Sequence, residues 1–185
     1  MVISRNGIIG ATMRGIAKEA GMSTGAIYHH YSSKEEVLYD VMRQSLSVST
    51  HLAEKTRLNM DSKEELIAEI YENIMIHFDK SAENKLHLYL AQEAILGNEI
   101  LRKKFKGQYK EWINATEELL IYIYGTSYNE QGKALASLLI GAIDGVVIQM
   151  LLGANIVPIE DIAKVYHLLL TDGIPHFMKL LSQQN

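Results

Sequence analysis

The sequence contains no cysteine and only two prolines among its 185 residues. Without cysteine, the chain has no disulfide, no thiolate nucleophile and no cysteine-ligated zinc site. The first proline is Pro158, so most of the chain lacks the residue that punctuates the loops of an all-β protein. Long helices are therefore expected.

Strong charge and long uninterrupted apolar runs are also absent. The net charge of −4 gives no overall attraction to nucleic acid, and the composition, with 48% hydrophobic and 22% charged residues, is typical of a globular protein. The most apolar stretch, residues 134–159, is interrupted by Asp144, Gln149 and Asn155, which favours a buried helix over a membrane span. The first residues show no signal-peptide pattern, so a cytoplasmic location is expected.

Apolar residues recur at helical spacing along the chain, and no segment alternates as a strand does. Ser33 with Glu36, and Ser62 with Glu65, have the spacing of a capping box, in which a serine and a glutamate satisfy the first amides of a helix. A long helix is expected from Ser33 to a break at residues 58–61. The expected fold class is all-α.

Residues 12–31, TMRGIAKEAGMSTGAIYHHY, have the spacing of a helix-turn-helix. Ala17 is small enough for the point where two helices cross, Gly21 allows the positive φ angle of a tight turn, and Ile27 would fill the core between the helices. A plain pair of helices could carry the same residues, so this spacing alone leaves DNA binding open.

The second helix of this motif favours DNA binding by its composition. From Ser23 to His30 its residues are mostly small or hydrogen-bonding, and none is acidic, so it could enter a major groove without repelling phosphate. Thr24, Ala26 and His29 would then face base edges.

The run ATMRGIAKEAGMSTGAIYHHYSSKEEVLYDVM resembles the N-terminal DNA-binding domain of the TetR family of bacterial transcriptional repressors, whose usual pattern reads T..IA..AGVS.GTLY.HF.SKEEL. The resemblance is close over residues 11–42 and extends to the rest of the chain only in architecture. It implies a larger helical domain that binds a small molecule and dimerises through its last two long helices. The matching residues are Thr12, Ile16, Ala17, Ala20, Gly21, Ser23, Gly25, Tyr28, Lys34 and Glu35, with Tyr31 in place of Phe.

The resemblance also implies roles for single residues. Tyr28 would donate its hydroxyl to a phosphate, Lys34 would meet another phosphate at the start of its helix, and Thr12 would contact the DNA backbone. Ile27 and Tyr31 are expected in the core. The residues expected to face bases are Thr24, Gly25, Ala26 and His29.

Members of the family place a complete helix before the helix-turn-helix. This sequence starts MVISRNG, which resembles only the end of such a helix with its terminating Gly7, so the first helix is expected to be missing. Without a first helix packed over them, Ile16, Ile27 and Tyr31 would lose part of their packing. The alternative to a DNA-binding regulator is therefore an effector-binding or protein-binding helical dimer whose truncated head does not bind DNA.

Two long apolar helices are expected at about residues 129–152 and 158–181, with Pro158 in the first turn of the second. The first is apolar nearly all round, so it is expected to be buried on more than one side. This wide apolar surface favours a homodimer built as a four-helix bundle over a self-contained monomer. Such a dimer would present two recognition helices to successive major grooves of a pseudo-palindromic operator.

Aromatic and polar residues interrupt the apolar faces of several helices, and a small apolar or amphipathic effector is expected among them. A buried Asp144 must find a hydrogen-bond donor, on either a ligand or a neighbouring helix, because an unpartnered carboxylate is costly to bury. The candidate ligand-binding residues are Tyr71, Met75, Tyr89, Glu93, Tyr109, Trp112, Thr116 and Asp144.

No pattern indicates an enzyme. The sequence has no HExxH zinc motif, no phosphate-binding loop and no spaced serine, histidine and aspartate set, so no catalytic residue, metal site or cofactor is expected. His29 and His30 are adjacent and point about 100° apart on a helix, which is unsuited to one metal. Glu83 and His87 are expected to be a solvated pair on one helix face.

These patterns together predict a one-component regulator. Residues 1–46 would form the DNA-binding domain, with its motif at 12–31, and residues 47–185 would form the helical effector-binding and dimerisation domain. The expected mode is a repressor that a small effector releases from operator DNA.

Overall fold

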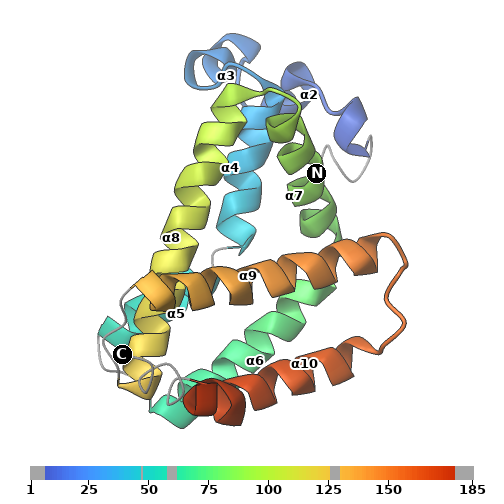
Figure 1. Cartoon of the computed structure of the whole chain (residues 1–185). Helices are drawn as coiled ribbons and strands as arrows, with labels where there is room; N and C mark the ends of the chain where they lie inside the picture. The colour runs from blue at the N-terminus through green and yellow to red at the C-terminus, as the bar shows by residue number, and fades with distance from the viewer. Residues whose placement is uncertain (1–6, 47, 58–61, 126–129, 178–185) are drawn as a thin grey trace. The chain divides into compact units, whose positions relative to one another are not determined.

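The structure is a computed structural model that describes residues 7–46, 48–57, 62–125 and 130–177. Within these ranges every regular element is helical (Figure 1), so the predicted all-α class is confirmed. Residues 7–10 form a helical turn. The elements that follow are α2 (Met13–Glu19), α3 (Thr24–His30), α4 (Lys34–Leu46), α5 (Val48–Arg57), α6 (Lys63–Asp79), α7 (Ser81–Ile95), α8 (Glu99–Tyr124), α9 (Glu130–Leu151), α10 (Ile159–Leu168) and the π-helical turn η1 (Leu169–Gly173).

The chain divides into two compact units. Unit 1 consists of Met1–Leu46 and Ala82–Lys106, and unit 2 consists of Ser47–Ser81 and Gly107–Asn185. Unit 1 therefore contains α2, α3 and α4 together with most of α7 and the first turns of α8. The sequence did not indicate that these later residues group with the N-terminal helices.

The helix boundaries follow local capping signals. Ser62 and Glu65 form the predicted capping box: the Glu65 amide donates to the Ser62 hydroxyl at 3.2 Å, and the Ser62 amide donates to the Glu65 carboxylate at 2.7 Å. Pro158 is the residue before α10 rather than within its first turn, a difference of one residue. The predicted break at residues 58–61 lies outside the described residues, as do residues 178–185.

The second predicted capping box is only half formed. The Glu36 amide donates to the Ser33 hydroxyl at 3.2 Å, as expected. The Glu36 carboxylate instead accepts hydrogen bonds from Ser32, from its amide at 3.0 Å and its hydroxyl at 2.9 Å. Lys104 of unit 1 lies 3.5 Å from this carboxylate, an interaction that spacing along the chain could not reveal.

The core of unit 2 is built from helices α5, α6, α8, α9 and α10 with η1. Leu66 of α6 is fully buried with Leu52 of α5 and Leu119 of α8. Further along, Ala136 of α9 packs with Leu170 of η1. These contacts give α9 one buried face.

The rest of α9 is exposed, and the prediction that this helix is buried on more than one side is wrong for the single chain. The segment Gln131–Leu151 is long and apolar enough to cross a membrane by length and composition, and only 17% of its most apolar window is buried. The physical reason is that the other helices of unit 2 cover one side of it. Leu138 and Leu152 are each 71% exposed.

Candidate functional site

Residues 13–30 fold as a helix-turn-helix in unit 1. Between α2 and α3 the backbone turns at Gly21, whose φ angle of +67° is in the left-handed region that favours glycine. Ala17 is 1% exposed and Ile27 is 3% exposed, and both pack with Met13 and with Val37 of α4. The structure therefore confirms the roles predicted for Ala17, Gly21 and Ile27.

Serine and threonine side chains fix the start of both helices. The Thr12 hydroxyl accepts a hydrogen bond from the Gly15 amide, and the Ser23 hydroxyl accepts one from the Ala26 amide, each at 3.1 Å. These caps satisfy amides that would otherwise lack a partner within the helix. Thr12 remains exposed, as a contact with the DNA backbone would require.

One face of α3 is open to solvent. Tyr28 is 55% exposed, and Thr24, Gly25 and His29 are also exposed, while Ala26 is half-buried. A Cβ atom added at Gly25 would lie 4.0 Å from the Ser23 hydroxyl, an ordinary contact, so crowding within the chain does not require glycine here. The exposed face is that of the residues predicted to meet DNA.

Lys34 makes contacts inside unit 1. Its ammonium donates to the carbonyl oxygen of Ile9 at 3.0 Å and to that of Ile8 at 3.5 Å, and it lies 3.8 Å from the Glu35 carboxylate. Lys34 thus ties the helical turn at residues 7–10 to the start of α4. Its contact with phosphate stays a prediction.

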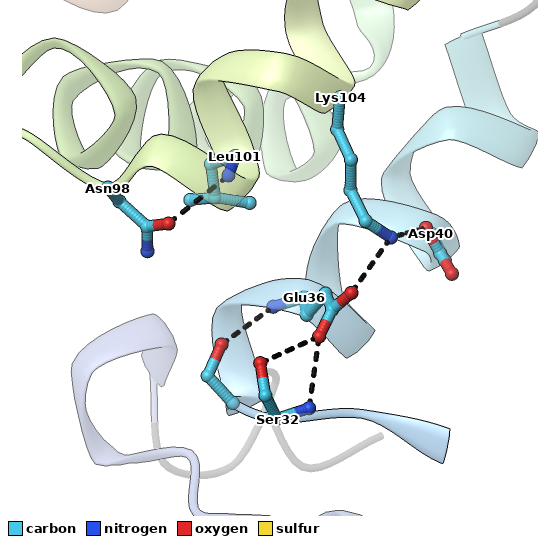
Figure 2. Close-up of polar contacts among 7 residues, drawn as sticks. Ser32, Glu36, Asp40, Asn98, Leu101 and Lys104 are labelled. Atoms are coloured by element: carbon cyan, nitrogen blue, oxygen red, sulfur yellow. Dashed lines mark hydrogen bonds and ion pairs between the residues drawn. The ribbon is translucent and has the colours of Figure 1, made fainter.

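Figure 2 shows a polar network in unit 1 that the sequence analysis missed. The Lys104 ammonium of α8 donates to the Asp40 carboxylate at 2.8 Å and lies 3.5 Å from that of Glu36. Glu36 in turn accepts hydrogen bonds from Ser32. The partners are 64 and 68 positions apart in the sequence, so no local pattern could have signalled them.

In unit 2 a carboxylate and two aromatic side chains lie together. The Tyr109 hydroxyl of α8 donates to Asp144 of α9 at 2.7 Å, and the rings of Tyr109 and Trp112 meet edge to face with 5.3 Å between their centroids. Burial raises the pKa of Asp144, while the Tyr109 hydrogen bond and nearby His77 act in the opposite direction. The neighbouring helix α8 therefore supplies a donor to Asp144.

Comparisons with known proteins identify the N-terminal region. Residues 1–41 match the sequence profile described as "Bacterial regulatory proteins, tetR family". Residues 1–41 therefore have a TetR-family sequence. The chain is also 48% identical over 42 residues to the HTH-type transcriptional regulator PksA of Bacillus subtilis (strain 168). That match covers 23% of this chain and 20% of PksA, so the alignment spans about a fifth of the length of the curated relative.

A similarity of fold extends over most of the chain. A Saccharomonospora viridis protein, described as a transcriptional regulator and crystallised in complex with choline, superposes with a TM-score of 0.64 over 92% of this chain and 91% of its own. The two sequences are 18% identical, so this similarity confirms the fold alone. The relatives found are described as regulators rather than enzymes.

The predicted effector residues are divided between the two units. Tyr71, Met75 and Thr116 are half-buried in unit 2 with Tyr109, Trp112 and Asp144, whereas Tyr89 and Glu93 belong to unit 1. The Tyr71 ring meets that of His167 edge to face at 5.5 Å. His167 was not among the predicted residues, and among the described atoms its buried Nδ1 has no hydrogen-bond partner.

The expected solvated pair of Glu83 and His87 is wrong. His87 is half-buried in unit 1 with its Nε2 atom inside the protein, and its ring packs edge to face on Phe105 with 5.4 Å between centroids. Burial lowers the pKa of His87 from 6.5 to about 4. Among the described residues, no group of three or more His, Cys, Asp or Glu side chains could hold a metal ion.

Proposed function

We propose that this chain is a one-component transcriptional regulator whose α3 helix reads double-stranded operator DNA. The observation that carries the proposal is the polarity of α3: Ile27 is buried, while the opposite face exposes Thr24, Tyr28 and His29. A helix with an anchored apolar side and an exposed hydrogen-bonding side suits a major groove. The match to the TetR family supports this reading.

Within this proposal the predicted DNA-binding residues have two kinds of role. Tyr28, Lys34 and Thr12 contact phosphates, which sets position and affinity but carries no sequence information. Thr24, Gly25, Ala26 and His29 face the bases, with Gly25 permitting close approach. Residues 1–46 form the DNA-binding domain, and residues 47–185 provide effector binding and dimerisation in a cytoplasmic repressor.

Substitutions at Tyr28 and His29 are expected to have different consequences. Tyr28→Phe removes one hydroxyl donor to phosphate and should weaken binding to every duplex by roughly tenfold. His29→Ala should instead change the preferred base at one position, where a direct contact discriminates by about 1–3 kcal/mol. Both effects can be measured by titrating each variant against a library of duplexes varied one base at a time.

His30 provides the matched control, because it is an exposed histidine of the same helix whose ring meets that of His29 edge to face at 5.2 Å but which has no assigned contact with DNA. His30→Ala should leave the base preferences unchanged. Equal losses on every duplex from Tyr28→Phe and His29→Ala would contradict the assigned roles. If the unchanged chain binds no duplex, the alternative of a helical dimer with an inactive head is favoured.

We infer that the partner in operator binding is a second copy of the chain, joined through α9 and α10. In a single protomer these helices expose apolar side chains, among them Leu138 of α9 and Val165 and Leu168 of α10, and Leu152 directly after α9 is also exposed, with exposed fractions of 58% or more. Burial of this apolar surface against a second copy of the chain favours association of the two copies. A two-fold dimer would also supply the second head that a pseudo-palindromic operator needs.

The effector is proposed to be a small amphipathic molecule that binds in unit 2 near Asp144. The desolvated Asp144 carboxylate and the Tyr109 and Trp112 rings are suited to a ligand that combines a cationic head with apolar groups. The choline held by the Saccharomonospora viridis protein is a molecule of this kind. Such an effector releases DNA only by binding the DNA-incompetent form more tightly than the competent one.

Choline is the probe for this site, and Trp112 is the only tryptophan of the chain, so its fluorescence reports binding. We expect a saturable fluorescence change, and we expect Asp144→Asn to weaken binding by roughly tenfold through loss of the charge attraction. Asp161→Asn is the control, because Asp161 is an exposed carboxylate of the same unit paired with Lys164. Identical choline titrations for the Asp144→Asn variant and the unchanged chain would contradict the assignment.

A further inference from the structure

Two carboxylates of α4 hold the short junction that follows the recognition helix. Glu36 accepts hydrogen bonds from the Ser32 amide and hydroxyl at 3.0 and 2.9 Å. Burial and the negative charge of Asp40, one turn further along α4, raise the pKa of the Tyr31 hydroxyl, so this carboxylate lies near Tyr31. Tyr31 follows α3 as its C-cap, so the two carboxylates lie against two consecutive residues of the connection between α3 and α4.

Lys104 lies against both of these carboxylates. Its ammonium is 2.8 Å from Asp40 and 3.5 Å from Glu36, and it also sits 5.4 Å from the centroid of the Tyr39 ring (Figure 2 shows the two ionic contacts). The side chains of Lys104 and Glu36 are 26% and 18% exposed, so solvent screens this contact less than one on the open surface. Without Lys104, two like charges four residues apart on one helix would repel each other.

The recognition helix depends on its junction because it is short. Helix α3 has seven residues, and Ile27 is its only buried residue. One apolar anchor limits how far the helix can move but does not set its rotation. The hydrogen bonds that Ser32 donates to Glu36 supply a second point of attachment, and two points define an orientation.

We propose that Lys104 is a positioning residue for the recognition helix, which it orients by holding Glu36 and Asp40 against the α3–α4 junction. The consequence for operator affinity rests on the proposed DNA binding. The consequence for the junction does not, because it concerns contacts within unit 1. The two can therefore be tested separately.

The first test measures amide hydrogen exchange in the full-length chain, without DNA. In Lys104→Met, exchange at Ser32 and in the peptide covering α3 should be roughly tenfold faster, since local opening governs exchange at such sites. Lys103→Met is the matched control, because Lys103 is an exposed lysine one position away, and it should leave this peptide unchanged. Lys104→Arg keeps the charge and should restore most of the protection.

Unchanged protection of the α3 peptide in Lys104→Met overturns the proposal. Exchange in α6 of unit 2 checks that the variant remains folded. If Lys104→Met does not fold, Glu36→Gln replaces it, because glutamine still accepts from Ser32 but is no longer attracted by the Lys104 charge. Faster exchange confined to the junction and α3 is then expected, and its absence overturns the proposal equally.

The second test uses the duplex that the unchanged chain selects from a random-sequence library. We expect Lys104→Met to bind it roughly tenfold more weakly than Lys103→Met does, because both lose one positive charge and only the first releases the junction. Equal affinities of these two variants overturn the inference. If no duplex is selected but the exchange result holds, the proposed DNA binding fails while the positioning role of Lys104 stands.

Discussion

If the proposed dimer forms through α9 and α10, a chain that carries Leu138→Asp and Leu168→Asp is expected to sediment as a single protomer of 20.8 kDa, and the unchanged chain is expected to sediment as a dimer. Leu138 of α9 is 71% exposed and Leu168 of α10 is 58% exposed in one protomer. Full burial of a leucine contributes about 1.5–3 kcal/mol, and a two-fold interface contains each residue twice. The four leucines of the proposed dimer interface, two from each protomer, would then become buried carboxylates, which should abolish association. Sedimentation velocity at several concentrations would show this loss.

Ile95→Asp is the control for this experiment. Ile95 of α7 is 83% exposed and lies in unit 1, so the variant introduces the same charge on an apolar position outside α9 and α10. It should remain dimeric. Operator affinity of the Leu138/Leu168 variant should fall by roughly a hundredfold, because a single head loses the gain from binding two half-sites. A dimer that survives both substitutions would place the interface on another surface.

Acidification is expected to destabilise unit 1 through His87. The pKa of His87 is about 4 in the folded chain and 6.5 in the unfolded chain. Between these values the unfolded state binds the proton and the folded state does not, so the free energy of unfolding falls as the pH falls from 6.5 towards 4. His87 alone should cost about 2 kcal/mol by about pH 5 and about 3 kcal/mol over the whole window.

His87→Gln removes this titration, so its unfolding free energy should depend less on pH over the same window. Urea unfolding followed by circular dichroism at a series of pH values measures the slope, and hydrogen exchange of α7 assigns the change to unit 1. His51→Gln is the control, because His51 is exposed. Parallel pH profiles for His87→Gln and the unchanged chain would show that burial of His87 is not the cause.

The parts of the fold that depend on neighbours along the chain were predictable. The cap at Ser62 and the turn at Gly21 lie where the sequence places them, and the caps at Thr12 and Ser23 are equally local, because each involves residues within three or four positions. The burial of Ile27 followed from the spacing of the helix-turn-helix. The residues expected to face bases could be named because they all belong to the same short helix.

Predictions that required knowledge of distant partners failed or were never made. His87 was expected in solvent, whereas in the structure its ring packs on Phe105, a contact that the sequence does not indicate. Glu36 was assigned to Ser33, but it binds Ser32, and Lys104 lies beside it. The effector candidates were chosen for aromatic and polar character alone, which could not show that Tyr89 belongs to unit 1.

The sequence by itself determined the helical class, the helix-turn-helix and the family resemblance, because capping, periodicity and glycine turns are local properties of the chain. The tertiary structure alone decided which helices share a unit, which face of α9 is covered and which cation meets the α3–α4 junction. These features arise where segments far apart in sequence are brought within a few ångströms. At that distance burial and charge pairing depend on the partner rather than on the residue alone.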